Sequence, residues 1–166
     1  MKRFHLLVYV LVCTFCEPAF GQSSGDEQAI EKLLEKLFKG MELGDSAMVH
    51  STFSDRATMA TVSRGKDNQT VLRQNANALK AFLDAVGTPH AETWHEEIWD
   101  TKIQTDGNFA QVWCAYAFYR GKAFSHCGAD SFHVYKTSDG WKFFHLAYSI
   151  RTTDCNIPEK IQSKHK

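Results

Sequence analysis

The segment Ser125–Phe132 (SHCGADSF) lies within a stretch whose side chains alternate in character as they do in a β-strand. Successive residues of a strand point to opposite faces of a sheet, so one face receives His126, Gly128, Asp130 and Phe132. An imidazole, a position without a side chain and a carboxylate are therefore expected on one wall. This pattern predicts the polar end of a small pocket, and it favours a pocket more strongly than any particular reaction.

Strand-like segments continue on both sides of this stretch. Four of them span residues 93–105, 109–119, 124–137 and 141–152, and they are separated by the hairpin signals Asp106-Gly107, Gly121-Lys122 and Asp139-Gly140. Earlier in the chain, apolar spacing predicts helices over residues 26–43, 45–53 and 70–86, and a short strand over residues 56–62. Helices followed by an antiparallel meander indicate an α+β fold with the helices on one face of the sheet.

The bulk composition excludes some classes of partner. The chain has 166 residues and a formal net charge of zero, so it lacks the electrostatic footprint of a protein that binds nucleic acid or an anionic membrane surface. Residues 1–21 resemble a secretory signal peptide with Lys2 and Arg3 before an apolar run, and cleavage is expected near Gly21. That run is too short to span a membrane. We expect an exported protein, periplasmic or extracellular, with one domain over residues 22–155 and a disordered tail over residues 156–166.

Three cysteines remain after the predicted signal peptide. An exported protein permits disulfides, and an odd number allows at most one internal pair. Cys114 lies in an apolar strand and is expected to be a small core residue, so the predicted pair is Cys127 with Cys155.

Two-residue hairpin turns predict a register for these strands. They would set Asp130 opposite Trp113 and Ser149, and Gly128 opposite Arg151. The predicted pocket face then carries His126, Asp130, Trp113, Tyr119, Phe132, Phe143, His145 and Arg151, and the same parity adds Trp94, Glu96, Ile98 and Asp100. Ala115, Ala117 and Gly128 are expected to leave room for a ligand in the middle of this face.

The opposite face of the predicted sheet is strongly apolar. It holds Trp99, Ile103, Val112, Cys114, Tyr116, Phe118, Leu146, Tyr148 and Ile150. Because such a face cannot be left in water, we expect a homodimer interface there. The assignment depends on an unbroken alternation of side chains between the two faces, since a single bulge would exchange them.

The predicted pocket residues allow more than one role. His126 and Asp130 could form a buried network that fixes the strand register, anchor a ligand, or transfer protons as a catalytic pair. Arg151 would hold Asp130 ionised, and Trp113, Tyr119 and His145 would complete a ligand-binding site. A zinc site built from His126, Asp130 and His145 has tolerable spacing, but no tight Cys/His cluster supports it, and we expect neither metal nor cofactor.

The order of elements, the FSHCGADSF stretch and the closing strand GWKFFHLAYSIR together resemble the nuclear transport factor 2-like superfamily. Within it, the chain is most similar to exported bacterial proteins of the family called "putative lumazine-binding", over roughly residues 27–155. The resemblance implies a cone-shaped curved sheet wrapped around helices, a cavity inside the cone and often a dimer. The superfamily includes isomerases, dehydratases, epoxide hydrolases, cyclases and proteins that only bind ligands.

From these observations we expect an exported protein that binds an unidentified small molecule in a partly aromatic pocket. The alternative is an acid/base enzyme on the same fold, of isomerase, dehydratase or hydrolase type, that uses His126 and Asp130 as its catalytic groups.

Overall fold

The computed structural model of this chain describes residues 25–166. The predicted signal peptide at residues 1–21 lies outside the described residues. The elements are α1 (Gly25–Leu43), α2 (Ser46–His50), β1 (Phe53–Arg64), β2 (Thr70–Gln74), α3 (Ala78–Gly87), β3 (Trp94–Asp106), β4 (Phe109–Arg120), β5 (Ala123–Thr137), β6 (Gly140–Ile150), α4 (Glu159–Gln162) and a terminal 3₁₀ turn (Ser163–His165). Within residues 25–166, no helix has the length and hydrophobicity needed to cross a membrane.

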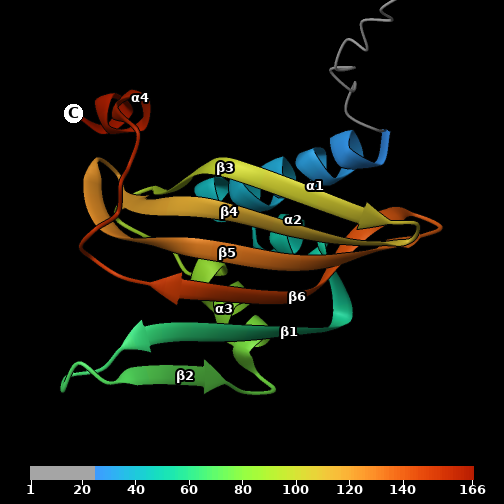
Figure 1. The fold of residues 1–166 in the computed structure, drawn as a ribbon, viewed down its shortest axis with the longest axis horizontal. Coiled ribbons are helices and arrows are strands. Elements are labelled where there is room, and N and C mark those ends of the chain that lie inside the picture. The colour runs from blue at the N-terminus through green and yellow to red at the C-terminus, as the bar shows by residue number, and fades with distance from the viewer. Residues whose placement is uncertain (1–24) are drawn as a thin grey trace, which may run out of the picture.

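The strands form a six-stranded sheet in the order β2-β1-β6-β5-β4-β3. All neighbouring strands are antiparallel except β1 and β6, which are parallel. Helices α1, α2 and α3 lie behind the sheet in Figure 1 and cover one of its faces, called the inner face below. The α+β fold with helices on one face of a curved sheet is therefore confirmed.

The core fills the space between α1 and the inner face. One stripe of α1 is buried because its apolar residues recur at helical spacing, and its buried members include Ile30, Leu34 and Leu37. They pack in one cluster with strand residues such as Phe132 and Phe143, whose ring centroids are 4.8 Å apart. This packing fixes the helix layer over β3–β6 and positions everything that lies between them.

The prediction of a helix over residues 70–86 is wrong in its first part. Residues Thr70–Gln74 form strand β2, which pairs with the end of β1, and α3 begins only at Ala78. The turn between the two strands is closed by the amide of Gly65, which donates to the carbonyl oxygen of Gln69 at 2.9 Å, and Asn68 has a φ of 57°. The turn at residues 65–68 therefore connects the two strands of a hairpin. The β-branched residues Thr70 and Val71, which follow the turn, favour a strand.

Bulges shift the predicted strand register by one residue. Between β4 and β5 the pairing changes after Phe118, so that Phe118 faces His126 and Cys114 faces Asp130. Between β5 and β6 it changes at Val134, and Asp130 faces Tyr148. The Gly121-Lys122 turn is confirmed, but the other two hairpins turn at Gly107-Asn108 and Ser138-Asp139, one residue from the prediction in each case.

The shift corrects the face assignment. The inner face carries His126, Asp130 and Phe132 as predicted, but their neighbours are residues that we expected on the opposite face: Val112, Cys114, Tyr116, Phe118, Leu146 and Tyr148. A one-residue slip turns every side chain of a strand over, which is why the error affects the whole set. These apolar residues belong to the core and the cavity wall, so they do not form the exposed interface from which we inferred a dimer.

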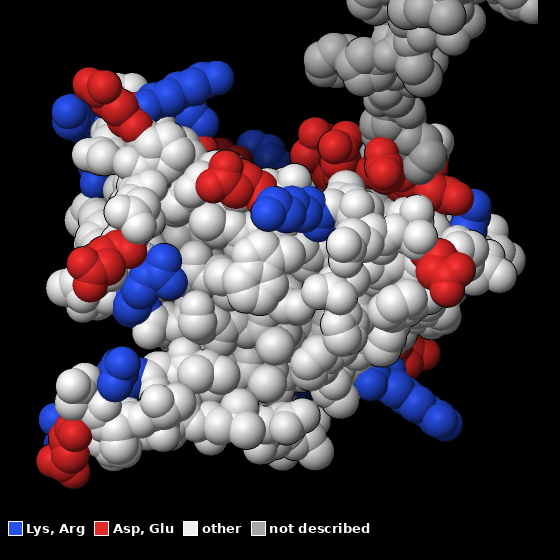
Figure 2. Space-filling model, in the orientation of Figure 1, with Lys and Arg blue, Asp and Glu red and all other residues white. Residues whose placement is uncertain are grey.

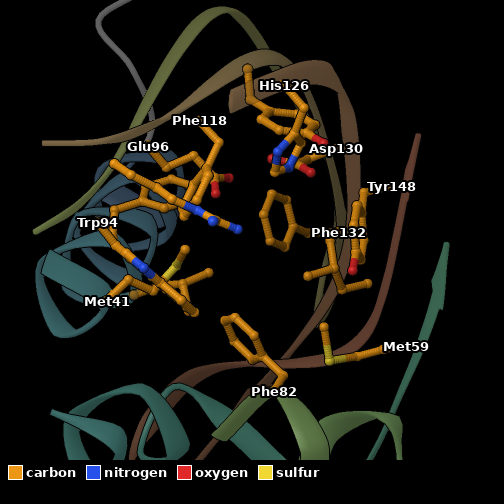
Figure 3. Close-up of a pocket in the computed structure, with 15 residues that line it drawn as sticks. Met41, Met59, Phe82, Trp94, Glu96, Phe118, His126, Asp130, Phe132 and Tyr148 are labelled. Carbon is orange, nitrogen blue, oxygen red and sulfur yellow. The ribbon is translucent and has the colours of Figure 1, made fainter. Parts of the chain in front are cut away.

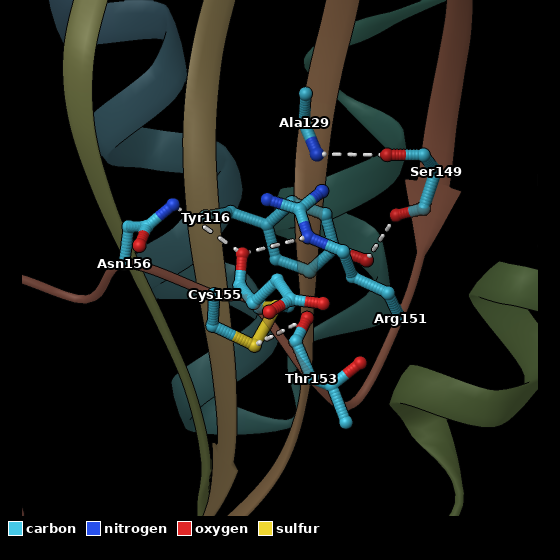
Figure 4. The surroundings of a disulfide bond; sticks show 9 residues. Tyr116, Ala129, Ser149, Arg151, Thr153, Cys155 and Asn156 are labelled. Carbon is cyan, nitrogen blue, oxygen red and sulfur yellow. Dashed lines mark hydrogen bonds between the residues drawn. A yellow bond between two sulfur atoms is a disulfide. The ribbon is translucent and has the colours of Figure 1, made fainter.

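The segment after β6 is ordered, which corrects the expected disordered tail. Cys155 forms a disulfide with Cys127, as predicted, with a Cα–Cα distance of 5.8 Å. Figure 4 shows the chain crossing from Arg151, past this bond, to Asn156 on the other side. Ile161 of α4 is 7% exposed and packs with Tyr119 and Cys127. The imidazole of His165 stacks on the Tyr119 ring at 3.8 Å, so the tail covers the end of the outer face.

Gly128 is required by a close approach between β5 and β6. A Cβ at this position would overlap the carbonyl oxygen of Ser149 and the ring of Tyr116. That carbonyl accepts a hydrogen bond from the Tyr116 hydroxyl at 2.8 Å, and the Ser149 hydroxyl oxygen accepts one from the amide of Ala129 at 3.0 Å. The absent side chain therefore makes room for the neighbouring strand and not for a ligand.

Replacing Gly128→Ala is expected to lower the free energy of unfolding by about 2 kcal/mol or more, because backbone atoms of β6 must move. Urea unfolding at neutral pH measures the change. Gly25→Ala is the matched control, since a Cβ there meets nothing within 4 Å. An equal loss in the two variants would contradict the close approach at Gly128.

Candidate functional site

A cavity of about 220 Å³ lies between the inner face of the sheet and helices α1 and α3. Its walls are mainly aromatic and thioether side chains, which Figure 3 shows around an open centre: Met41, Met59, Phe82, Trp94, Phe118, Phe132 and Tyr148. Every layer of the fold contributes to this wall, so the cavity depends on the packing of α1 and α3 against the sheet. A concave, mostly apolar site with a few convergent polar groups is what a small-molecule pocket requires.

Two carboxyl groups provide the main polarity of this cavity. Asp130 on β5 is 3% exposed, and its side chain is hydrogen-bonded to that of Glu96 on β3. The thiol of Cys114 lies 4.0 Å from Oδ2 of Asp130. Among residues 25–166, neither carboxyl forms an ion pair with a lysine or arginine. Asp130 is therefore buried and Glu96 half-buried, and neither carboxyl has a positive partner within residues 25–166.

Burial raises the pKa of both carboxyl groups. The pKa of Asp130 rises to about 7, and the hydrogen bond from Glu96 limits this rise. The pKa of Glu96 is raised well above its usual range by burial, by the negative charge of Asp130 and by their hydrogen bond. At neutral pH Glu96 therefore keeps its proton and donates a hydrogen bond to Asp130, whose carboxyl is only partly ionised. The carboxyl oxygens that this hydrogen bond does not use can accept hydrogen bonds from a bound molecule.

His126 lies on the same wall, and its imidazole and the Asp130 carboxylate border the same space in Figure 3. Its ring centroid is 5.1 Å from that of Phe118, and its Nδ1 is 3.0 Å from the Ser125 hydroxyl oxygen. Burial and the nearby charge of Arg120 lower the pKa of His126, so the imidazole is neutral at pH 7. Within residues 25–166, Nε2 has no hydrogen-bond partner and remains free for a ligand.

The structure separates the other predicted site residues from His126 and Asp130. Trp113 is 49% exposed on the outer face, and Tyr119 is buried under the C-terminal segment. His145 pairs with His133 on the outer face, and its Nδ1 lies 2.7 Å from the Thr58 hydroxyl. Arg151 lies at the end of β6, where its Nε donates to the Asp154 carbonyl at 3.3 Å (Figure 4). All four corrections follow from the bulges, which turn these side chains away from the inner face.

The three residues considered as zinc ligands, His126, Asp130 and His145, do not lie together, because His145 is on the other face of the sheet. No group of three potential metal ligands occurs in the described part of the chain.

Sequence reasoning did not select three residues of this site. Glu96 was placed on the correct face but not chosen, although an acidic residue between Trp94 and Ile98 on an inward-facing strand was a usable signal. Tyr148 was placed on the wrong face. Arg120, at the end of β4, lines the cavity and was not considered, because its position depends on the bulge beside it.

Comparison with solved structures gives the class of fold. A protein from Pseudomonas putida described as nuclear transport factor 2-like and of unknown function has a TM-score of 0.62 at 15% identity, covering 86% of this chain and 94% of that one. A similar protein from Shewanella baltica has a TM-score of 0.56 at 20% identity, covering 76% and 94%. A "putative dehydratase" of this fold from Streptomyces avermitilis has a TM-score of 0.59 at 16% identity, covering 78% and 99%. The fold is thus nuclear transport factor 2-like, as expected.

The family follows from the sequence model that matches. The model described as "Putative lumazine-binding" covers residues 25–149, and the chain belongs to that family. Comparison with curated proteins gives no match.

The raised carboxyl pKa values predict a pH-dependent stability. Asp130 has a folded pKa of about 7 and an ordinary value of 3.8, so the native state holds more protons than the unfolded state between these values. The free energy of unfolding should therefore fall as pH rises through this window, with a slope of up to ~1.4 kcal/mol per pH unit from this group.

Asp130→Asn should remove the part of that slope that comes from Asp130, because the amide does not ionise, while Glu96, whose pKa is also raised, continues to contribute. Urea unfolding from pH 4.5 to 8 measures the slope. Asp106→Asn, on an exposed residue at the end of β3, is the control and should leave the slope unchanged. A slope in Asp130→Asn as steep as that of the wild-type protein would show that this carboxyl does not contribute.

Proposed function

We propose that this protein binds a small, planar molecule in the cavity between the helices and the inner face. The observation that carries the proposal is the hydrogen-bonded pair of Glu96 and Asp130, which opens onto an aromatic cavity of about 220 Å³ together with His126. A buried carboxyl pair without a cation costs stability, and a ligand that hydrogen-bonds to it offsets part of that cost. The family description names lumazine, a planar bicyclic molecule, and a compound of that shape is consistent with these walls.

The polar groups suggest how such a molecule is oriented. Glu96 and Asp130 provide carboxyl oxygens that accept hydrogen bonds, and His126 provides a free ring nitrogen, all on one side of the cavity. The apolar side chains of α1, α3 and β1 face them from the other side. A ring with hydrogen-bonding atoms along one edge satisfies both walls, because its faces contact aromatic groups while its edge meets the carboxyl pair.

The test compares two histidines on opposite faces of the same sheet. Saturation-transfer NMR with phenol, 4-hydroxybenzamide and indole should detect binding to the wild-type protein, and His126→Ala should weaken it about fivefold through loss of one hydrogen-bonding group. His145→Ala should leave the affinities unchanged, since that imidazole lies on the outer face. No binding by any compound would overturn the proposal, and equal weakening by both variants would remove His126 from the site.

Proton-transfer catalysis is a second candidate function. The observation that favours it is the pKa of Asp130 near 7 beside a neutral imidazole in the same cavity, since groups of this kind exchange protons readily at neutral pH. The fold neighbour described as a dehydratase shows only the shared architecture. Chemical change of a carbonyl compound, such as exchange of the α-hydrogens of cyclohexanone in D₂O, would favour this function if Asp130→Asn abolished it.

We also propose that the protein is exported and forms a homodimer. The disulfide between Cys127 and Cys155 supports export, because such bonds persist in oxidising compartments. The face of the sheet opposite the helices supports the dimer: Figure 2 shows few charges over its centre, and Phe109, Trp113 and Tyr135 are between 37% and 49% exposed. The mass of the mature exported chain, beginning near Gln22, would test the first point.

Trp113→Glu should shift the dimer toward monomer by at least tenfold in dissociation constant, because a charge would be buried in the interface. Light scattering over a concentration series measures the shift. Lys36→Glu, on an exposed residue of α1 at the helical side of the sheet, is the control and should leave the dissociation constant unchanged. A wild-type protein that remains monomeric at high concentration would contradict the dimer.

A further inference from the structure

Arg120 is the one cation that borders the cavity in the described part of the chain. It is the last residue of β4 and pairs with Trp94, so it shares the inner face with Phe118 two residues earlier. The hairpin turn at Gly121-Lys122 follows immediately, which places Arg120 at the exposed end of the cavity wall. Its position on this face depends on the same bulge that orients His126.

The guanidinium group of Arg120 forms no hydrogen bond or ion pair with a side chain of residues 25–166. Within residues 25–166 it forms no ion pair with a carboxylate, although Glu96 lines the same cavity. Its charge reaches the cavity, because it contributes to the lowered pKa of His126. An arginine presents its donors in a planar fork that matches a carboxylate, and this fork is unused here.

The cavity is therefore electrically polarised. The carboxyl pair is partly ionised at neutral pH and would repel a ligand anion, whereas Arg120 at the exposed end forms no ion pair within residues 25–166. A ligand anion is favoured only at the Arg120 end. A single cation also suits a single negative charge better than a phosphate dianion, whose second charge would stay unpaired beside the carboxyl pair.

We propose that Arg120 selects planar aromatic carboxylates, with the ligand carboxylate on the guanidinium and a hydrogen-bonding group at the opposite end of the ring on the Glu96–Asp130 pair. The inference rests on the proposed binding function and names its ligand class. The ring lies between Trp94 and Phe118 on one side and Met41 on the other. Because Arg120 is solvated before binding, its contribution to affinity is moderate, about tenfold.

The test uses two compounds of the same shape. 4-Hydroxybenzoate and 4-hydroxybenzamide differ in the charge of one group, and isothermal titration at pH 7 should show the carboxylate binding about tenfold more tightly to the wild-type protein. Arg120→Gln should remove this preference while the amide affinity stays within twofold. Lys122→Gln is the matched control: that ammonium is two residues away, does not line the cavity, and bonds to the Lys166 carbonyl.

A second measurement does not depend on any variant. The preference of the wild-type protein for the carboxylate should shrink as sodium chloride rises from 20 to 500 mM, because salt screens an exposed ion pair, while the amide affinity should stay constant. Equal affinity for the two compounds, or a preference that survives in Arg120→Gln, would overturn the role of Arg120 and leave the binding function standing. Failure of every neutral and anionic compound to bind would instead overturn the binding function itself.

Discussion

The one-residue bulge near the β4–β5 hairpin is the constraint on which the rest of the site depends. It lets Phe118 and Cys114 face His126 and Asp130, so that the aromatic residues of β4 turn toward α1 and not toward solvent. Bulges increase local twist and bend a strand, which suits a sheet that must curve around helices. The curvature leaves a cavity between β3–β6, α1 and α3, while the rest of the same interface is closely packed.

The carboxyl pair of Glu96 and Asp130 is costly within that packing. Two acidic groups without a cation have raised pKa values, and the folded protein must hold a proton that the unfolded chain would release at neutral pH. An apolar pair of similar size would be expected to give a more stable core. Sites that lower stability are often sites of function, because binding and proton transfer require polar groups in a dry environment. Here the groups that lower stability are also the groups that face the cavity.

The C-terminal segment reinforces the same region from the other side of the sheet. The disulfide fixes it to β5, His165 stacks on Tyr119, and Lys164 pairs with Glu97 at 2.7 Å. Tyr119 and Glu97 directly adjoin Phe118 and Glu96, whose side chains point to the opposite face. The segment therefore supports the two strands that position the polar end of the cavity, and this support joins residues more than 60 positions apart in sequence.

The sequence by itself determined the order of most elements, the α+β class, the disulfide and the shared face of His126, Asp130 and Phe132. These depend on short-range periodicity, on turn residues and on the small number of available cysteines, all of which can be inferred without coordinates. The tertiary structure alone decided which side chains surround that face. Which residues of one strand share a face follows from simple alternation along that strand. Which residues of the next strand lie on the same face changes with each bulge, and no residue pattern here marks a bulge in advance. For this reason the structure places Trp113, Tyr119, His145 and Arg151 outside the site. It places Tyr148 and Arg120 within it. Glu96 meets Asp130 only because the curved sheet brings β3 and β5 to the same cavity across the intervening β4.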